Sequence, residues 1–213
     1  EHGQGTTTGE GTGINPDIPD SGNEGDGEGG EVEKVIPSGL LHNTENTTIT
    51  QSLDWNGEGH GVTVDAKKAT VNLSSANITV PQGTEEDKYY AINVLNGNVY
   101  ASVNNGSYGN YGFSGGGNYN IEGDIYVGIN GNAYIGISGS DNWLKGAVID
   151  DGSGVTHLML KSSATWENVS SNVEKGVTSH IDRLGVWDGA KIVQAGDSGD
   201  IVIDNYSGNT KVT

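Results

Sequence analysis

Gly199-Asp-Ile-Val-Ile-Asp-Asn-Tyr-Ser-Gly208 is the last of three C-terminal stretches in which a short apolar run leads into a polar turn. Equivalent apolar positions in the three stretches are Leu160, Ile181 and Ile203. They recur at an interval of about 21 residues, close to the length of one coil of a β-solenoid. In such a fold each inward side chain stacks on its counterpart in the neighbouring coil. The spacing therefore predicts a rod of stacked strands.

The first half of the chain has the same interval, which separates Ile78, Val99 and Ile121. From Pro37 onward, short runs alternate apolar and polar residues and are broken by Gly, Asn and Asp, which is typical of strands buried on one side. A β-sandwich is the alternative, because it also contains short strands separated by frequent turns. The recurring interval favours the solenoid.

Composition limits the fold class. The chain has 213 residues with 36 Gly, one Phe, one Met, no Cys and 32% hydrophobic residues, too few for a thick helical core. The sequence therefore predicts an all-β protein. It contains no run of about 18 apolar residues, so we expect no direct membrane insertion by this fragment. Without Cys, neither disulfides nor thiolate metal sites stabilise the fold.

The charge balance excludes one class of partner. With 28 Asp and Glu against 10 Lys and Arg, the formal net charge is −18. Nucleic acids and anionic lipid surfaces are bound by clustered Lys and Arg, so we expect no nucleic acid partner.

Two segments differ sharply in composition. Residues 1–36 are rich in Gly, Thr, Glu and Asp and contain no aromatic residue. Such a segment buries too little apolar surface to offset its ordering entropy. We expect a disordered acidic extension at 1–36 and a β-solenoid at 37–213.

Two motifs resemble a known family. The stretch Val155-Thr-His-Leu-Met-Leu-Lys-Ser-Ser-Ala-Thr-Trp166 and the Asn-Tyr-Ser-Gly turn ending at Gly208 resemble the passenger region of bacterial autotransporters, which are type V secretion proteins. The resemblance rests on motifs between Val155 and Gly208, and on composition for the remaining solenoid. It implies a right-handed parallel β-helix with coils of roughly 21 residues, a length within the range of solenoid repeats. It also implies secretion or display on the extracellular face of the outer membrane, so the chain looks like a fragment of an adhesin-like passenger.

A Gly-rich stretch between Val103 and Ile121 interrupts the regular interval, and it carries four aromatic residues: Tyr108, Tyr111, Phe113 and Tyr119. Aromatic rings offer flat apolar surfaces, and tyrosine adds a hydroxyl, a combination suited to sugar or protein recognition. The alternative is a loop that packs its rings back onto the rod. We interpret the four residues as a ligand-binding site, with Trp143 in a nearby polar turn as a fifth member.

Two other tryptophans have a structural interpretation. Trp166 and Trp187 are separated by the same interval, which predicts that they stack in adjacent coils as core or half-buried positions. Thr, Asn and Asp on the flanks of the rod are candidates for polar ladders with another copy of the chain.

Catalytic and metal-binding patterns are weak. Asp150-Asp151 is the best carboxylate pair, but a following Gly-Ser-Gly run makes a turn the favoured interpretation. Acidic turns at Glu85–Asp87 and Asp197–Asp200 lack the calcium-loop motifs. The histidines lack a ligand spacing, and no nucleophile elbow is present. The sequence therefore predicts no enzyme, no metal and no cofactor.

The functional hypothesis follows from these patterns. We expect a surface-exposed bacterial adhesin fragment that attaches to host or bacterial cells through a glycan or protein ligand. A self-associating stalk with homotypic contacts, as in aggregation or biofilms, is the first alternative. A polysaccharide-active enzyme is the second and weaker one.

Overall fold

The computed structural model describes residues 38–101 and 117–210. The described residues form strands and turns without a helix, which confirms the all-β prediction. Predictions for the extension at 1–36 lie outside the described residues. Residues 38–101 and 117–210 contain thirteen strands: β1 (Ser38–Asn43), β2 (Thr48–Asn56), β3 (His60–Thr79), β4 (Tyr90–Ala101), β5 (Tyr119–Glu122), β6 (Asp124–Ser138), β7 (Trp143–Lys145), β8 (Val148–Asp150), β9 (Val155–Lys161), β10 (Thr165–Asn168), β11 (Ser179–Val186), β12 (Lys191–Gln194) and β13 (Ile201–Gly208).

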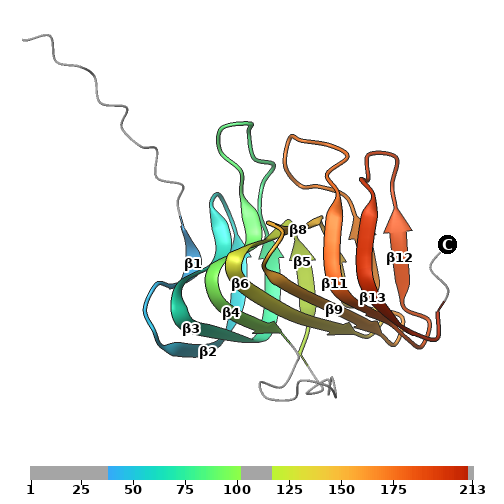
Figure 1. The fold of residues 1–213 in the computed structure, drawn as a ribbon, viewed down its shortest axis with the longest axis horizontal. Coiled ribbons are helices and arrows are strands. Elements are labelled where there is room, and N and C mark those ends of the chain that lie inside the picture. The colour runs from blue at the N-terminus through green and yellow to red at the C-terminus, as the bar shows by residue number, and fades with distance from the viewer. Residues whose placement is uncertain (1–37, 102–116, 211–213) are drawn as a thin grey trace, which may run out of the picture. The chain divides into compact units, whose positions relative to one another are not determined.

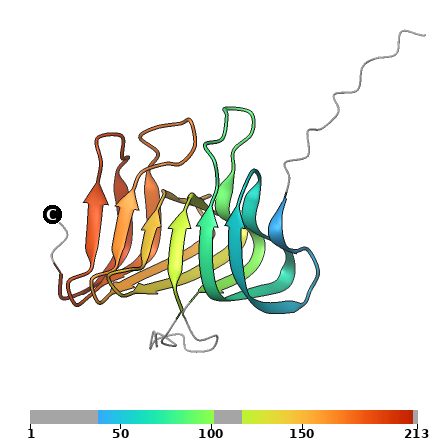
Figure 2. The ribbon, with the colours of Figure 1, turned by 180° about the vertical axis from the view of Figure 1, so that it is seen from behind.

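All these strands belong to one sheet, and every pair of described strands is parallel. A β-sandwich requires antiparallel sheets, so that alternative is excluded. The long strand β3 has Val62, Val71 and Ile78 among its buried residues, and each is completely buried. Each of the three belongs to a different row of register partners, so the sheet curls around one core (Figures 1 and 2).

The three rows define three faces of the curled sheet. Register partners on the first face are Leu41, Val62, Ile92, Ile125 and Val148. Those on the second face are Ile49, Val71, Val99, Ala133 and Thr156. Those on the third face are Trp55, Ile78, Ile121, Leu144, Trp166 and Ile192. Neighbouring strands lie about 4.8 Å apart, so the side chains within each row of register partners contact one another and build a narrow apolar core.

The register agrees with the predicted interval only in part. Ile181 lies opposite Ile203, as the sequence predicts. Leu160 instead lies opposite Val186, and Ile78 lies opposite Ile121, so Val99 is not its partner. Long loops between strands, such as residues 80–89, add residues to a turn of the sheet without changing the pairing. The chain therefore does not keep a constant interval.

The predicted pairing of two tryptophans is wrong. Trp166 is fully buried, but its register partners are Leu144 and Ile192. Trp187 follows the end of β11 and is half-buried on the outer side of the second face. Its indole packs on Gly185, where an added Cβ would lie only 2.1 Å from the ring.

Corners of the sheet use Asn and Gly as predicted, but they lie within long bent strands and do not separate short ones. Gly97 in β4 has φ of +96°, and an added Cβ would lie 2.5 Å from the Ala69 carbonyl oxygen, so only glycine fits there. Asn96 donates to Asp65, and Asn132 donates to Asn98 in the neighbouring row. Polar side chains thus form hydrogen bonds between neighbouring strands within one chain.

Aromatic rings from the neighbouring strands β3, β4 and β6 stack on one another at the first face. The ring of Tyr90 lies between those of His60 and Tyr126, with centroid distances of 5.4 and 5.1 Å. The backbone N–H of Tyr90 donates to Nδ1 of His60 at 3.1 Å. Burial, assisted by nearby His42, lowers the pKa of His60 to about 4. The ring is therefore a neutral acceptor at pH 7.

We expect the buried His60 to make folding stability depend on pH. The unfolded chain binds a proton at a pKa near 6.5, whereas the folded chain resists it until about pH 4. Stability is then complete above pH 6.5 and falls as the pH decreases toward 4, by about 3 kcal/mol. Urea unfolding of the wild type and of His60→Asn, which keeps an acceptor but does not titrate, measures this contribution. The stability advantage of the wild type should shrink between pH 7 and 4. Parallel pH profiles for the two proteins would contradict the assignment.

Candidate functional site

Trp143 is the predicted site residue that the structure places at the surface. It begins β7, which pairs with β5 and β10 on the third face. Because neighbouring Leu144 is completely buried, strand alternation directs Trp143 and Lys145 outward. Asn142 fixes the preceding turn, since its Oδ1 accepts from the Tyr119 backbone N–H at 2.9 Å and its Nδ2 donates to the Ser138 carbonyl oxygen at 2.5 Å.

A hollow of about 420 Å³ lies beside Trp143. Its lining combines one aromatic ring with charged and hydroxyl groups: Glu122, Ser140, Trp143, Leu144, Lys145, Thr165 and Glu167. This mixture of an apolar surface and a few polar groups is typical of small-ligand sites.

Three charged residues of this hollow are register partners in the neighbouring strands β5, β7 and β10. Lys145 lies between Glu122 and Glu167. Its Nζ donates to Glu122 Oε1 at 3.1 Å. That hydrogen bond, with the charges of Glu122 and Glu167, raises the pKa of Lys145 above its ordinary value. The hollow therefore presents one ammonium group between two carboxylate side chains.

A second hollow, of about 290 Å³, shares Glu122 and Lys145 with the first. Its other lining residues come from the segments after β3 and β10: Val80, Gln82, Val169, Ser170, Ser171 and Lys175. Because the same ion pair lines both hollows, they adjoin. We name the two hollows together the Trp143 groove.

A buried carboxylate holds the segment that lines the second hollow. Asp124 is completely buried. Its Oδ1 accepts from the backbone N–H groups of Ala147 and Ser171, at 2.8 and 2.9 Å. Its Oδ2 accepts from Ser170 Oγ and Asn172 Nδ2, also at 2.8 and 2.9 Å. The carboxylate thus ties residues 170–172 to the start of β6.

Asn172 joins this segment to the loop of residues 80–89. Its side chain exchanges two hydrogen bonds of 3.1 Å with the backbone N–H and carbonyl oxygen of Tyr89. At the exposed side, Lys88 Nζ lies 2.8 Å from Glu174 Oε2. Both loops project from the same edge of the sheet in Figure 1. The Trp143 groove therefore ends against two loops that stabilise each other.

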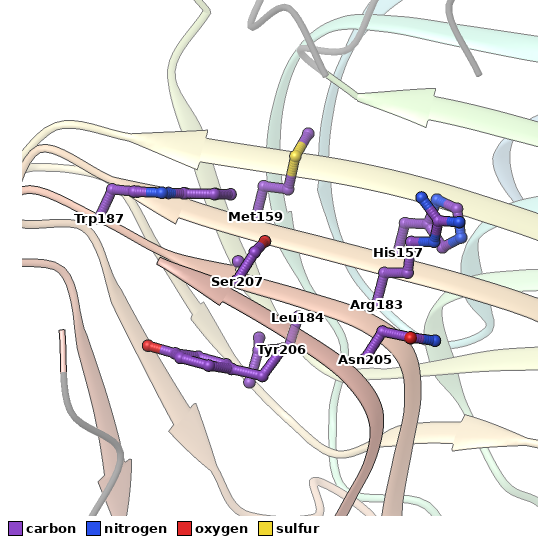
Figure 3. A pocket seen from close by; sticks show the side chains of 9 residues that line it. His157, Met159, Arg183, Leu184, Trp187, Asn205, Tyr206 and Ser207 are labelled. Carbon is purple, nitrogen blue, oxygen red and sulfur yellow. The ribbon is translucent and has the colours of Figure 1, made fainter. Parts of the chain in front are cut away.

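A separate hollow of about 290 Å³ lies on the outer side of the second face (Figure 3). Figure 3 shows Trp187 and Tyr206 at one end and His157, Arg183 and Asn205 at the other. Burial, followed by the positive charge of Arg183, lowers the pKa of His157. We name this the Trp187 hollow; Met159, Leu184, Gly185 and Ser207 complete its lining.

Of the remaining predicted aromatic residues, only Tyr119 lies within the described part of the chain. Its side chain is 2% exposed, and its hydroxyl donates to the Leu73 carbonyl oxygen at 2.7 Å. The prediction for Tyr119 therefore needs correction, since a ring buried in the core offers no stacking surface. Tyr108, Tyr111 and Phe113 lie outside the described residues, and their role in binding stays a prediction.

The carboxylate pair Asp150-Asp151 divides between two environments. The Asp150 side chain is 1% exposed, with Oδ2 3.7 Å from His180 Nδ1, and burial raises its pKa. Asp151 is exposed, and its Oδ2 accepts from the Tyr126 hydroxyl at 3.2 Å. The turn favoured by the sequence therefore begins after Asp150, which is the last residue of β8.

The described residues contain neither a metal-binding cluster nor a membrane-spanning helix. Across residues 38–101 and 117–210, no three His, Asp or Glu side chains converge in a way that could hold a metal ion. The same ranges contain no helix that is long and apolar enough to span a membrane.

Sequence reasoning missed the charged part of the Trp143 groove. Glu122, Lys145 and Glu167 follow one another at nearly the interval found for apolar positions, and the register pairs them. A search for charged residues that recur at this interval would have identified these three residues from the sequence. Asp124 had no comparable signal, because its partners Ser170 and Asn172 lie in a loop far along the chain.

Comparisons with known proteins add no relative: no family model, no curated protein and no solved structure matches this chain.

Proposed function

We propose that this chain is part of a bacterial surface adhesin that binds saccharides on host or bacterial cells through the Trp143 groove. The single observation that carries the proposal is the partly exposed Trp143 beside a hollow lined by hydroxyl, carboxylate and ammonium groups. An indole stacks on the apolar face of a sugar ring, while such polar groups bond its hydroxyls. The motif resemblance to autotransporter passengers supports display on the extracellular face of the outer membrane or secretion.

The proposed scaffold is a right-handed parallel β-helix. Support comes from one parallel sheet that curls around a single core and from register rows that repeat over several turns. Parallel strands joined by crossovers are almost always right-handed in other proteins. Such a rod holds a binding face away from the cell surface.

Charges in the groove favour a neutral saccharide. Lys145 and Lys175 are balanced by Glu122 and Glu167 within the lining. An ion pair supplies donors and acceptors for hydroxyl groups without selecting a net charge. Affinity per site is expected to be low, and attachment then depends on many copies acting together.

Trp143→Ala should reduce binding to a neutral glycan array and to whole cells at least tenfold, because the stacking surface is lost. Stability should fall by less than for a fully buried tryptophan, since the side chain is partly exposed. Val193→Ala is the matched control, an exposed apolar residue on the same face outside the groove. Unchanged glycan binding by a folded Trp143→Ala protein would contradict the groove as the site.

The residues of the Gly-rich stretch need a separate variant. Replacing Tyr108, Tyr111 and Phe113 together with Ala tests the aromatic site predicted from the sequence. Loss of binding in this variant, with retention in Trp143→Ala, would move the site to that stretch. Aggregation of beads coated with the purified chain, without binding to any glycan or cell, would favour the self-associating stalk.

A further inference from the structure

The Trp187 hollow contains the one arginine in the sequence, Arg183. Arg183 is exposed and lies in β11 between His157 and Asn205, its register partners on either side. A guanidinium group has a planar array of donors that matches a carboxylate with two parallel hydrogen bonds. The guanidinium brings one positive charge to the lining of the hollow, in a chain whose net charge is −18.

The aromatic side of the hollow is held in place by close packing. Trp187 packs on the backbone at Gly185, where a Cβ atom would come within 2.1 Å of two ring carbons. Any other residue at position 185 would displace the indole. The ring is therefore held without a side chain beneath it, which lowers the entropy cost of stacking a ligand.

The dimensions of the hollow fit a single sugar unit. Arg183 and Gly185 are two positions apart on the same side of β11, which is about 7 Å along the strand. One six-membered sugar ring with a carboxylate substituent spans such a distance. A volume of about 290 Å³ is just below the usual range for ligand pockets, which suits one sugar unit better than a larger ligand.

We propose that the Trp187 hollow binds an acidic monosaccharide unit of the uronic acid type. The indole of Trp187 stacks on the sugar ring, the guanidinium of Arg183 pairs with the carboxylate, and Asn205 and Ser207 bond the hydroxyls. This site lies on a different face from the Trp143 groove and is independent of it.

The charge of the whole chain narrows the ligand further. Screening limits repulsion to about 8 Å at physiological ionic strength, so one carboxylate at the hollow is tolerated. A polymer with an acid on every residue would meet the acidic surface over its whole length. The ligand is therefore a glycan whose acidic units are separated from one another by neutral ones.

Titration of the folded chain with methyl glucuronide and methyl glucoside, followed by the NMR signal of the indole N–H groups, tests this site. The wild type should bind the glucuronide at least tenfold more tightly than the glucoside. Arg183→Gln should remove that difference while retaining the weaker binding of the glucoside. Trp187→Ala should weaken the binding of both sugars at least tenfold.

Two controls make the outcome decisive. Lys67→Gln removes one exposed positive charge far along the chain from the hollow and should leave the preference intact. Trp143→Ala should also retain glucuronide binding, which separates this site from the Trp143 groove. Equal affinity of the wild type for both sugars, or loss of the preference in Lys67→Gln, would overturn the proposal. Urea midpoints of all variants show whether each is folded.

Discussion

Replacing Asp124 with alanine is expected to lower the free energy of unfolding by about 4 kcal/mol, because four donors lose their shared acceptor in a site without exposure to solvent. The loss is a large fraction of the roughly 5–15 kcal/mol that stabilises a typical domain. Urea unfolding followed by circular dichroism measures it. We also expect faster hydrogen exchange at the Ser171 and Ala147 amides, since both donate to this carboxylate.

The loop connection makes this prediction more specific than a general loss of stability. Ser170 and Ser171 line the Trp143 groove, so the variant should also bind neutral glycans more weakly. Asp54→Ala is the matched control, because Asp54 is an exposed carboxylate that accepts from Asn77. It should cost less than about 1 kcal/mol. Should Asp124→Ala fail to fold, Asn172→Ala removes one donor and gives a smaller loss. A change below about 1 kcal/mol in Asp124→Ala would show that the network does not stabilise the fold.

Trp166→Ala is expected to destabilise the chain by about 3–5 kcal/mol. The indole is completely buried between the rows of Leu144 and Ile192, and its N–H donates to the Gly146 carbonyl oxygen at 2.9 Å. Alanine leaves a cavity that the neighbouring strands β7 and β12 cannot close, because backbone hydrogen bonds fix the distance between strands. The midpoint of urea unfolding should fall accordingly.

A comparison of two tryptophans on one face provides the control. Trp143 and Trp166 lie in neighbouring strands, but the first points outward and the second points into the core. Trp143→Ala should lose glycan binding and keep its stability, whereas Trp166→Ala should lose stability first. Trp166→Phe should recover about half of the loss, since it refills most of the volume but cannot donate to Gly146. Equal urea midpoints for the two alanine variants would contradict the assigned burial.

Much of the fold could be predicted from alternation. The runs at Val62–Val64, Thr70–Leu73 and 77–80 are recognisable as extended segments because apolar and polar residues alternate in them. The structure joins them, up to Thr79, into the single strand β3. At corners such as Gly97 the bent strand stays paired with the neighbouring strand. Composition alone does not distinguish such a bend from a loop that separates two strands. The constant interval fails for a related reason, since residues 80–89 leave the sheet without changing the register.

The candidate site could be predicted only where one residue is unusual within its segment. Trp143 stands out because it follows a polar turn, and its outward direction follows from buried Leu144. The prediction for Tyr119 is wrong because this residue is next to a Gly-rich stretch, although its alternation with Ile121 indicates an inward side chain. Arg183 stands out in the sequence only as the one arginine, because its place in the same hollow as Trp187 depends on how the indole packs on Gly185.

The register between β3 and β5 has a practical consequence for engineering. Ala101 pairs with Leu73 and Tyr119 pairs with Ala76, so positions 101 and 119 lie opposite two residues of β3 that are close together in sequence. Doubling the length of a loop between two fixed ends costs only about 0.6 kcal/mol of closure entropy. We therefore expect the chain to accept grafted peptides, such as epitopes or affinity tags, between these two positions without disturbing the neighbouring strands. The scaffold can then acquire new specificities by exchanging segments at its corners while the core stays the same.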